Sequence, residues 1–573
     1  MSAPPEKKQK PEQPDSQTAT SPSETIQKKS TETFDGTAEK STREVPREEM
    51  FRPPINRAMR VLDRPFFRKT VPLSAARVLE NRNIAKCRSA LEKSREALQL
   101  DRITIIRPDP EPEIAAQGKK CLLLEPEVRH NDASTWGPVL TELAQAESVR
   151  VIPYNLELEY EYWTYHDIMT SILPEDEQDE LPTGFSIVGH VAHLNLRPAY
   201  LPYKHLIASV LVDKNPSVRT VINKTDDVGT VSEYRTFSYE LLAGDPSLDV
   251  VVKEGDCTFH FDYSAVYWNS RLNTEHRRLV ESFAPGSAVC DVMAGVGPFA
   301  VPAGKRGVFV WANDLNPASY ASLSDAIARN KVSPYVRAFC GDGMEFIRSS
   351  AQQLLQAAQD PQSDVVIMSK PPRRSELKAA SAASSAGSAG SKANAGSGTG
   401  PVVPQPPKEI KRIKLPRTFQ HYVMNLPATA TSFLPAFIGV YAGHEDLFEP
   451  DPSSSSSSPL SSTSGAAAAA TSGAAAADAA TAPSTAQLPM IHVHCFSTKS
   501  DDNQDAYVKI AAELSAQLGH AFVAPKGRVL EGGASPVSER DELVIHDVRD
   551  VAPQKRMFCA SFRLPREVAF RKV

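Results

Sequence analysis

The second half of this 573-residue chain alternates short apolar runs with segments of helical periodicity. The clearest unit contains, in order, an apolar run, an acid, two glycines, a helix start and a second apolar run: 287–290, Asp291, Gly295, Gly297, Pro298 and 308–311. A strand, a glycine turn, a helix and a second strand in this order predict a parallel βαβ unit. We expect the alternation to continue from residue 264 onward and to form a doubly wound parallel α/β sheet.

Two smaller folded parts are predicted before that sheet. Residues 49–180 are expected to form a small α/β domain, with helices at 74–100 and 138–146, strands at 103–107 and 121–124, and an amphipathic segment leading into a helix at 154–173. Residues 181–263 are rich in β-branched and aromatic residues and predict a β-rich middle domain. Its expected strands occupy 185–188, 190–196, 218–222, 234–239, 250–252 and 258–261, with a crossing helix at 203–213.

Three segments lack the apolar pattern of a folded core. Residues 1–48 consist mainly of Pro, Ser, Thr, Glu and Lys and are predicted to be a disordered tail. Residues 375–409 are rich in Ala, Ser, Gly and then Pro, and residues 450–488 contain runs of Ser and Ala. We interpret both as surface insertions that leave the sheet of residues 264–573 intact.

Composition and charge narrow the class of protein. The chain has 64 Lys and Arg against 69 Asp and Glu, so any nucleic-acid contact must be a local patch. Its 7 cysteines include no Cys-x-x-Cys pair, which favours a reduced, intracellular protein without a zinc ribbon. No run of about 18 apolar residues is present, and the first residues lack the apolar core of a signal peptide. Cytosol or nucleus is therefore expected.

The glycine turn predicts a nucleotide-like ligand. Gly295-x-Gly297-x-x-Ala300 fits a dinucleotide fingerprint, and Asp314 stands near the distance of a ribose-binding acid. Acids also end the first strand, at Asp291, and follow the third, at Asp342. Three acidic strand ends suit a ligand with an ammonium, a ribose and an adenine. This favours S-adenosylmethionine, with a nicotinamide cofactor as the rival.

Two further segments carry candidate chemistry. The side chain of Asn273 or Thr274 is expected to cap a helix, and the arginines of its first turn oppose the helix dipole, which suits a nearby phosphate. Residues 422–425 form an apolar strand that ends in Asn425-Leu-Pro. We interpret it as the fourth strand of the sheet, in preference to 364–372, because ligands bind at such strand ends and the competing segment lacks an amide.

Four motifs together resemble the tRNA (guanine(37)-N(1))-methyltransferase family of the eukaryotic and archaeal type. They are YWNSRLNTEHRRL, DVMAGVGPFAVPA, ANDLNP with GDG, and VMNLPATA, and the resemblance covers residues 50–573 apart from the two insertions. It implies a Rossmann-like class I methyltransferase domain at 264–573, preceded by the middle domain and by a tRNA-recognition domain at 49–180. It also implies methyl transfer from S-adenosylmethionine to ring nitrogen 1 of the guanosine on the 3′ side of the anticodon.

The resemblance also assigns catalytic roles. That nitrogen carries a proton in neutral guanine, so a base must remove the proton while charge builds on the 6-oxygen. By similarity Glu275 is the general base, Arg235 is the cation at the 6-oxygen, and Asn425 belongs to the catalytic set. Positioned proton transfer contributes about 100- to 10,000-fold in rate.

Cofactor contacts follow from the same matching. Asp314 is expected to hold the ribose, Asp342 and Gly343 the adenine side, and Asp291, Gly295 and Gly297 the methionine end, with His276, Leu315 and Asn425 also lining the site. No metal is expected. We interpret His190, His193, His492 and His494 as structural histidines on strands, because the spacing of a zinc module is absent.

The partner implied by the resemblance is tRNA, contacted at the anticodon stem-loop and body by a monomer without membrane attachment. Candidate phosphate contacts are Arg219, Lys224, Lys411, Arg412, Lys414, Arg417, Arg563, Arg566 and Arg571. The expected location is cytoplasm and nucleus, with a fraction in the mitochondrial matrix. The rival readings are a wybutosine-pathway aminocarboxypropyl transferase, a nicotinamide-dependent oxidoreductase and a non-catalytic tRNA-binding protein.

Overall fold

The computed structural model describes residues 46–178, 181–225, 234, 236, 238–368, 409–449, 487–526, 534–535, 537 and 542–572. The predicted tail at 1–48 and the insertions at 375–409 and 450–488 lie outside the described residues, except at their inner ends. Arg235 also lies outside them. Helix α1 (Arg47–Met50) belongs to a unit that ends at Arg52, and every other element belongs to a unit that begins at Pro53.

A four-stranded antiparallel sheet forms the first part of the second unit. Its order is β2-β3-β1-β4, with β1 at Lys69–Val78, β2 at Ile106–Pro108, β3 at Lys120–Leu123 and β4 at Val149–Leu158. Helices α2 (Ile84–Lys93), α3 (Pro112–Ala116), α4 (Pro138–Gln145) and α5 (Tyr165–Ile172) accompany it. The expected helix at 138–146 and strand at 121–124 are confirmed within one residue.

The predicted helix at 74–100 is wrong at both ends. Residues 74–78 belong to β1, and the helix occupies only Ile84–Lys93. Strand β1 pairs with β3 on one side and β4 on the other, and its residues from Leu73 to Val78 are all buried. A strand that is buried on both faces shows no alternation of apolar and polar residues. Because alanine favours helices, Ala75 and Ala76 then indicate a helix in the sequence.

The middle part contains a second four-stranded sheet, of order β5-β6-β7-β8. Its strands are β5 (Ser186–Val188), β6 (Val191–Leu194), β7 (Thr220–Lys224) and β8 (Tyr239–Gly244). The predicted crossing helix is confirmed as α6 (Lys204–Lys214), which joins the parallel strands β6 and β7. The strand expected at 234–239 begins only at Tyr239. In the register of β7 against β8, Gly244 lies opposite Thr220. Glycine is required there, because a Cβ at position 244 would lie 1.9 Å from the Arg219 carbonyl oxygen.

A hairpin of β9 (Asp249–Glu254) and β10 (Cys257–Asp262) follows. Buried residues of this hairpin, including Val250 and Phe259, share one hydrophobic core with the helices that cover one face of the next sheet. The hairpin therefore packs directly onto the part of the chain that carries the glycine turn.

Seven strands form the largest sheet, in the order β13-β12-β11-β16-β17-β19-β18. They are β11 (Ala288–Asp291), β12 (Phe309–Asp314), β13 (Val336–Cys340), β16 (His421–Met424), β17 (Met490–Thr498), β18 (Val544–Ala552) and β19 (Lys555–Arg563). The first five in spatial order are parallel, as predicted, but β19 is antiparallel to both of its neighbours. A two-residue turn joins β18 to β19, and so short a connection permits only antiparallel pairing.

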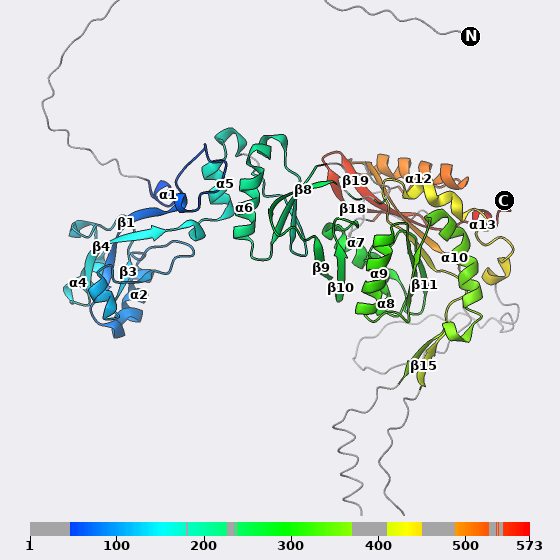
Figure 1. Ribbon diagram of the computed structural model, residues 1–573, viewed down its shortest axis with the longest axis horizontal. Helices are drawn as coiled ribbons and strands as arrows, with labels where there is room; N and C mark the ends of the chain where they lie inside the picture. The colour runs from blue at the N-terminus through cyan, green and yellow to red at the C-terminus, as the bar shows by residue number, and fades with distance from the viewer. Residues whose placement is uncertain are drawn as a thin grey trace, which may run out of the picture. The chain divides into compact units, whose positions relative to one another are not determined.

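Helices cover both faces of this sheet (Figure 1). Helices α7 (Asn273–Ser282), α8 (Ala300–Lys305) and α9 (Pro317–Arg329) share a core with Val289, Val310 and Val423. Helices α10 (Gly343–Ala357) and α12 (Gln504–Leu518) and the 3-10 helix η9 (Ala430–Phe437) share another with Cys290, Trp311 and Tyr422. Successive strand residues thus point to opposite faces, and the strands are buried on both.

The identity of the fourth strand is confirmed. Strand β16 pairs directly with β11, whereas the competing segment forms β14 (Val365–Met368), which pairs antiparallel with β15 (Glu409–Ile413) in a separate two-stranded sheet. The short helices that remain are α13 (Arg566–Ala569), η1 (Pro65–Phe67), η2 (Asn81–Asn83), η3 (Ala133–Thr135), η4 (Tyr160–Tyr162), η5 (Glu175–Glu177), η6 (Pro198–Tyr203), η7 (Ser270–Leu272), η8 (Pro361–Ser363) and η10 (Glu445–Phe448). Among the described residues, no helix has the length and apolar character needed to span a membrane.

Candidate active site

The glycine turn after β11 uses its two glycines differently. Both have positive φ, +56° at Gly295 and +94° at Gly297. A Cβ at Gly297 would lie 2.6 Å from Leu323 Cδ1, whereas a Cβ at Gly295 would face open space. Gly297 therefore permits close packing of α8 on α9, and Gly295 keeps the backbone exposed toward a ligand. Helix α8 begins at Ala300, two residues after the predicted start at Pro298.

A cleft lies at the carboxyl ends of β11, β12, β13 and β16, where ligands bind in open α/β sheets. Its lining comprises Tyr234, Tyr267, Val292, Met293, Gly295, Asn313, Asp314, Leu315, Asn316, Ser319, Asp342, Gly343, Asn425, Leu426 and Phe433. Six of the predicted site residues are thereby brought together: Gly295, Asp314, Leu315, Asp342, Gly343 and Asn425. Gly297, Asp291, Glu275 and His276 are not part of this lining.

The two acids of the cleft are held by backbone N–H groups. Asp314 Oδ2 accepts a hydrogen bond from Gly295 N at 2.8 Å, and Oδ1 accepts one from Asn316 N at 2.9 Å. Burial raises the pKa of Asp314, although these hydrogen bonds oppose the rise. Asp342 caps α10, with Oδ1 accepting from Met344 N at 2.9 Å and Glu345 N at 3.0 Å. Both carboxylates are therefore fixed in place.

Several buried oxygen atoms around the cleft have no hydrogen-bond partner among the described residues. They are both carboxylate oxygens of Asp291, Oδ1 of Asn313 and Oδ1 of Asn425. Asp291 is fully buried, and its burial, together with the nearby charge of Asp314, raises its pKa to about 8. Buried polar groups are normally hydrogen-bonded. Unpartnered acceptors grouped in this way fit a ligand that presents an ammonium and N–H donors, as S-adenosylmethionine does.

Glu275 is enclosed beside this cleft rather than within it. It lies on α7, is 3% exposed, and accepts hydrogen bonds from Arg278 Nε and Nη2 at 2.7 and 2.8 Å. A third bond, at 2.7 Å, joins Glu275 Oε1 to His494 Nε2 of β17. Burial alone would raise the pKa of Glu275, but Arg278 and His494 more than offset burial and hold it below its usual range. The carboxylate is therefore ionised.

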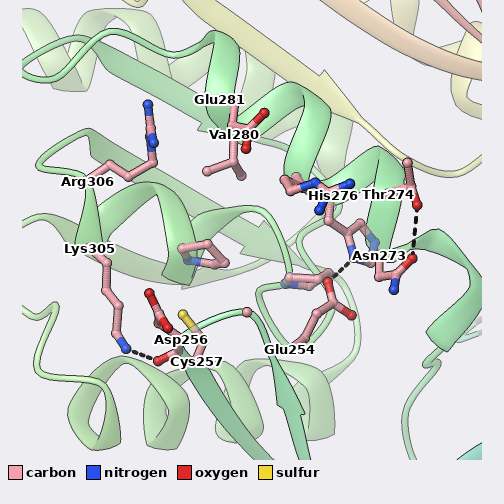
Figure 2. Close-up of a pocket in the computed structure, with 14 residues that line it drawn as sticks. Glu254, Asp256, Cys257, Asn273, Thr274, His276, Val280, Glu281, Lys305 and Arg306 are labelled. Atoms are coloured by element: carbon pink, nitrogen blue, oxygen red, sulfur yellow. Dashed lines mark hydrogen bonds and ion pairs between the residues drawn. The ribbon is translucent and has the colours of Figure 1, made fainter. Parts of the chain in front are cut away.

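His276 faces a different depression, between the β9–β10 turn, α7 and α8 (Figure 2). Its Nδ1 lies 2.6 Å from Glu254 Oε1. The charged side chains of this lining are three acids and three bases: Glu254, Asp256, Glu281, Arg277, Lys305 and Arg306. Helix α7 begins at Asn273 with Leu272 as its N-cap residue, so the predicted side-chain cap is wrong.

The sequence-based interpretation missed the neighbours of Glu275. His494, expected to be only structural, contacts it directly, and one ligand atom each of Glu275, His494 and Cys559 lie within 4.8 Å of one another. A metal ion uses such a spacing, but the Arg278 guanidinium already occupies both Glu275 oxygens. The alternation of His492 and His494 along one strand was the available sequence signal.

Several bases expected to contact RNA are engaged by the chain itself. Arg412 pairs with Glu409 and Arg563 with Glu542, each at 3.0 Å, and Arg571 donates to the carbonyl oxygens of Leu518 and Gly519 at 3.2 Å. The exposed pair of Arg412 and Glu409 contributes little stability. The role of these bases in RNA binding stays a prediction.

Three features define a Rossmann-like class I methyltransferase that uses S-adenosylmethionine. They are the strand order, the antiparallel strand β19 next to the edge of the sheet, and the cleft of fixed acids at the strand ends. The chain is 51% identical over 526 residues to a tRNA (guanine(37)-N(1))-methyltransferase of Aspergillus fumigatus, covering 92% of this chain and 96% of that protein. A protein of the same name from Emericella nidulans is 48% identical over 91% of this chain and 96% of its own length. This chain belongs to the tRNA (guanine(37)-N(1))-methyltransferase family.

Two family models match in addition. Residues 165–247 match the TYW2 N-terminal domain, and residues 250–378 match the TRM5/TYW2 methyltransferase domain. Among solved structures, Trm5b from Pyrococcus abyssi is 17% identical, with a TM-score of 0.45 over 86% of this chain and 99% of that one.

Proposed function

We propose that this protein transfers the methyl group of S-adenosylmethionine to ring nitrogen 1 of guanosine 37 in the tRNA anticodon loop and thereby maintains the reading frame. The observation that carries this proposal is the 51% identity to a relative of that name across 92% of the chain, which includes the cleft, Glu275 and Asn425. The aminocarboxypropyl transferase alternative is not favoured by these relatives.

The roles of the chain's own residues follow from the chemistry of guanine. The cofactor, when bound, supplies an electrophilic methyl group at the cleft. Glu275 is proposed to take the proton from ring nitrogen 1, for which it must be ionised, and its hydrogen bonds from Arg278 and His494 keep it so. A guanosine must leave its stack to reach a methyl group within the cleft.

Asn425 is proposed to serve both the binding of the cofactor and the placement of the guanine whose proton Glu275 takes. It follows β16 directly, its Oδ1 is buried without a partner among the described residues, and it lines the cleft. Met424, its predecessor, presents its carbonyl oxygen 3.3 Å from His494 Nδ1, so the neighbour of Glu275 also contacts the strand end of the cleft. We propose that Asn425 binds the cofactor and orients the guanine.

Arg235 is proposed to stabilise the charge that develops on the 6-oxygen. It lies outside the described residues, but Tyr234, the residue before it, lines the cleft. A cation aimed at developing charge contributes about 100- to 1000-fold in rate.

Residues 49–180 are proposed to recognise the body of the tRNA, and residues 264–573 the anticodon stem-loop, in a protein that acts as a monomer. We place it in cytoplasm and nucleus, with a fraction in the mitochondrial matrix. Size-exclusion chromatography with light scattering tests the monomeric state. Imaging of a tagged full-length chain tests the location.

A direct test uses the purified protein, S-adenosylmethionine and two tRNA transcripts that differ only in carrying G or A at position 37. We expect a primer-extension stop at position 37 of the G transcript alone, and a nucleoside whose mass corresponds to one added methyl group. An added aminocarboxypropyl group would instead support the wybutosine-pathway enzyme, and an unmodified G transcript would contradict both.

A further inference from the structure

Three polar side chains form a row beneath Glu275. His494 on β17 pairs with Cys559 on β19, and Cys559 pairs in turn with His546 on β18. Directly paired residues of neighbouring strands point to the same face of a sheet. His494 and Cys559 are fully buried, and His546 Nε2 lies 3.9 Å from Glu275 Oε2. The row therefore gathers titratable groups from three strands under one carboxylate.

The contacts of His494 define its protonation. Nε2 lies 2.7 Å from Glu275 Oε1, and Nδ1 lies 3.3 Å from the Met424 carbonyl oxygen. An ionised carboxylate and a carbonyl oxygen only accept hydrogen bonds. Both ring nitrogens must therefore donate, and an imidazole with two donors is the positively charged imidazolium.

We propose that His494, held as an imidazolium, is a positioning residue that fixes the Glu275 carboxylate and keeps it ionised for proton abstraction. This inference rests on the proposed function, because it assigns a purpose to a neighbour of the proposed base. His494 is separated from the cleft by the end of β16 and acts through Glu275 rather than on the substrate.

The other charged and titratable groups around this pair agree with the assignment. Glu275 faces Arg278 of its own helix, Cys559 of β19 and His546 of β18. Burial lowers the pKa of His494, but Cys559 and Glu275 outweigh burial and raise it. Burial and the charge of Arg278 outweigh the more distant Glu275 and lower the pKa of His546 to about 4, so His546 stays neutral. Asp291, at the end of β11, is the remaining acid that interacts with His494.

The pH dependence of single-turnover methyl transfer to the G37 transcript tests the proposal. Transfer needs ionised Glu275, so the rate falls at low pH along the titration of that carboxyl group. Removal of an adjacent cation raises the pKa of a carboxyl group by about one to three units. In H494Q, which retains a side-chain N–H but no charge, we expect the acid limb to move to higher pH by about one unit or more.

The matched control is H492Q. His492 lies two residues earlier on β17, is buried, and bonds Ser561 Oγ at 2.8 Å and His421 Nδ1 at 3.0 Å rather than Glu275. A general loss of packing would slow H492Q and H494Q alike without moving the limb. A shift in H494Q alone supports the proposal, and superimposable normalised profiles for wild type, H492Q and H494Q overturn it.

A second measurement covers the case in which H494Q does not fold. Nitrogen NMR of the wild-type protein distinguishes an imidazolium, with two protonated ring nitrogens, from a neutral ring with one, and H492Q assigns the neighbouring histidine signal. Two protonated nitrogens on His494 near neutral pH support the proposal, and one unprotonated nitrogen overturns it. A wild-type protein that leaves the G37 transcript unmethylated contradicts the proposed function instead, and the two failures are therefore distinguishable.

Discussion

The Asp314 carboxylate holds the Gly295 backbone through a hydrogen bond of 2.8 Å from Gly295 N to Asp314 Oδ2. The acid at the end of β12 thus fixes the turn that follows β11, although the two strands are consecutive only through helix α8. Asp314, the proposed ribose contact, and the glycine turn therefore form one rigid wall of the cleft. Substitutions in the turn distinguish ligand binding at Gly295 from helix packing at Gly297.

We expect G297A and G295A to fail differently. Left-handed backbone costs an alanine about 1–2 kcal/mol at either position. At Gly297 the new methyl group also meets Leu323, and such overpacking costs a further ~1–3 kcal/mol. Urea unfolding should show the larger loss of stability in G297A. Calorimetry should show the larger loss of S-adenosylmethionine affinity, about tenfold, in G295A, where the methyl group enters the cleft. Equal losses of stability would contradict this division.

Substitution E275Q should retain cofactor affinity and slow single-turnover methyl transfer by about 100- to 10,000-fold, because an amide cannot accept the guanine proton. E281Q is the control: the same chemical change on the same helix, at an exposed side chain outside the cleft. Quench-flow with labelled cofactor measures both rates. If E275Q and E281Q transfer at the wild-type rate, Glu275 is not the base.

Substitution D291N should stabilise the cofactor-free protein increasingly as pH rises. The carboxyl group titrates at about 8 in the folded protein and near 3.9 when unfolded, so the unfolded state releases its proton first. Between these two pKa values the free energy of unfolding of the wild-type protein falls by up to about 1.4 kcal/mol per pH unit. D291N avoids this loss because its amide does not titrate. Thermal unfolding from about pH 5 to pH 8 measures the difference. D325N, at a partly exposed acid, is the control, and parallel curves for D291N and wild type would show that Asp291 is ionised throughout.

Removal of residues 375–408 should leave cofactor binding and methyl transfer within about twofold of the wild-type values. The pairing of β14 with β15 sets Met368 opposite Glu409, so the last described residue before the excised segment and the first one after it already lie side by side. A short Gly-Ser turn closes such a pair at little entropic cost. Binding and single-turnover assays measure the result. Loss of transfer with intact cofactor binding would assign the segment to the tRNA, and an insoluble product would assign it to the fold.

The cleft was largely predictable because each of its acids follows an apolar run. Asp314 and Asn425 end or follow parallel strands, and parallel strands bring their carboxyl ends to one edge of a sheet. His276 could not be placed in this way. Consecutive helix residues point about 100° apart, so when Glu275 faces β17, its neighbour His276 faces the β9–β10 hairpin.

The contact between Glu275 and His494 was beyond sequence reasoning. The two residues are 219 positions apart, and their meeting depends on the placement of α7 over β17. Cys559 joins them only because β19 pairs antiparallel with β17, a reversal that the alternating pattern from residue 264 did not indicate. Local periodicity identifies elements, whereas contacts of this kind depend on the order of strands in the sheet.

The distance along the chain between Glu275 and its partners also bears on synthesis. A ribosome completes α7 long before it reaches His494 and Cys559, which belong to the last strands to emerge. Domains form as units during translation, and an ionised carboxylate without its partners is costly to bury. A nascent or prematurely terminated chain that ends before β17 therefore has no means of completing the surroundings of Glu275, the proposed base, which form only after β17 and β19 have left the ribosome.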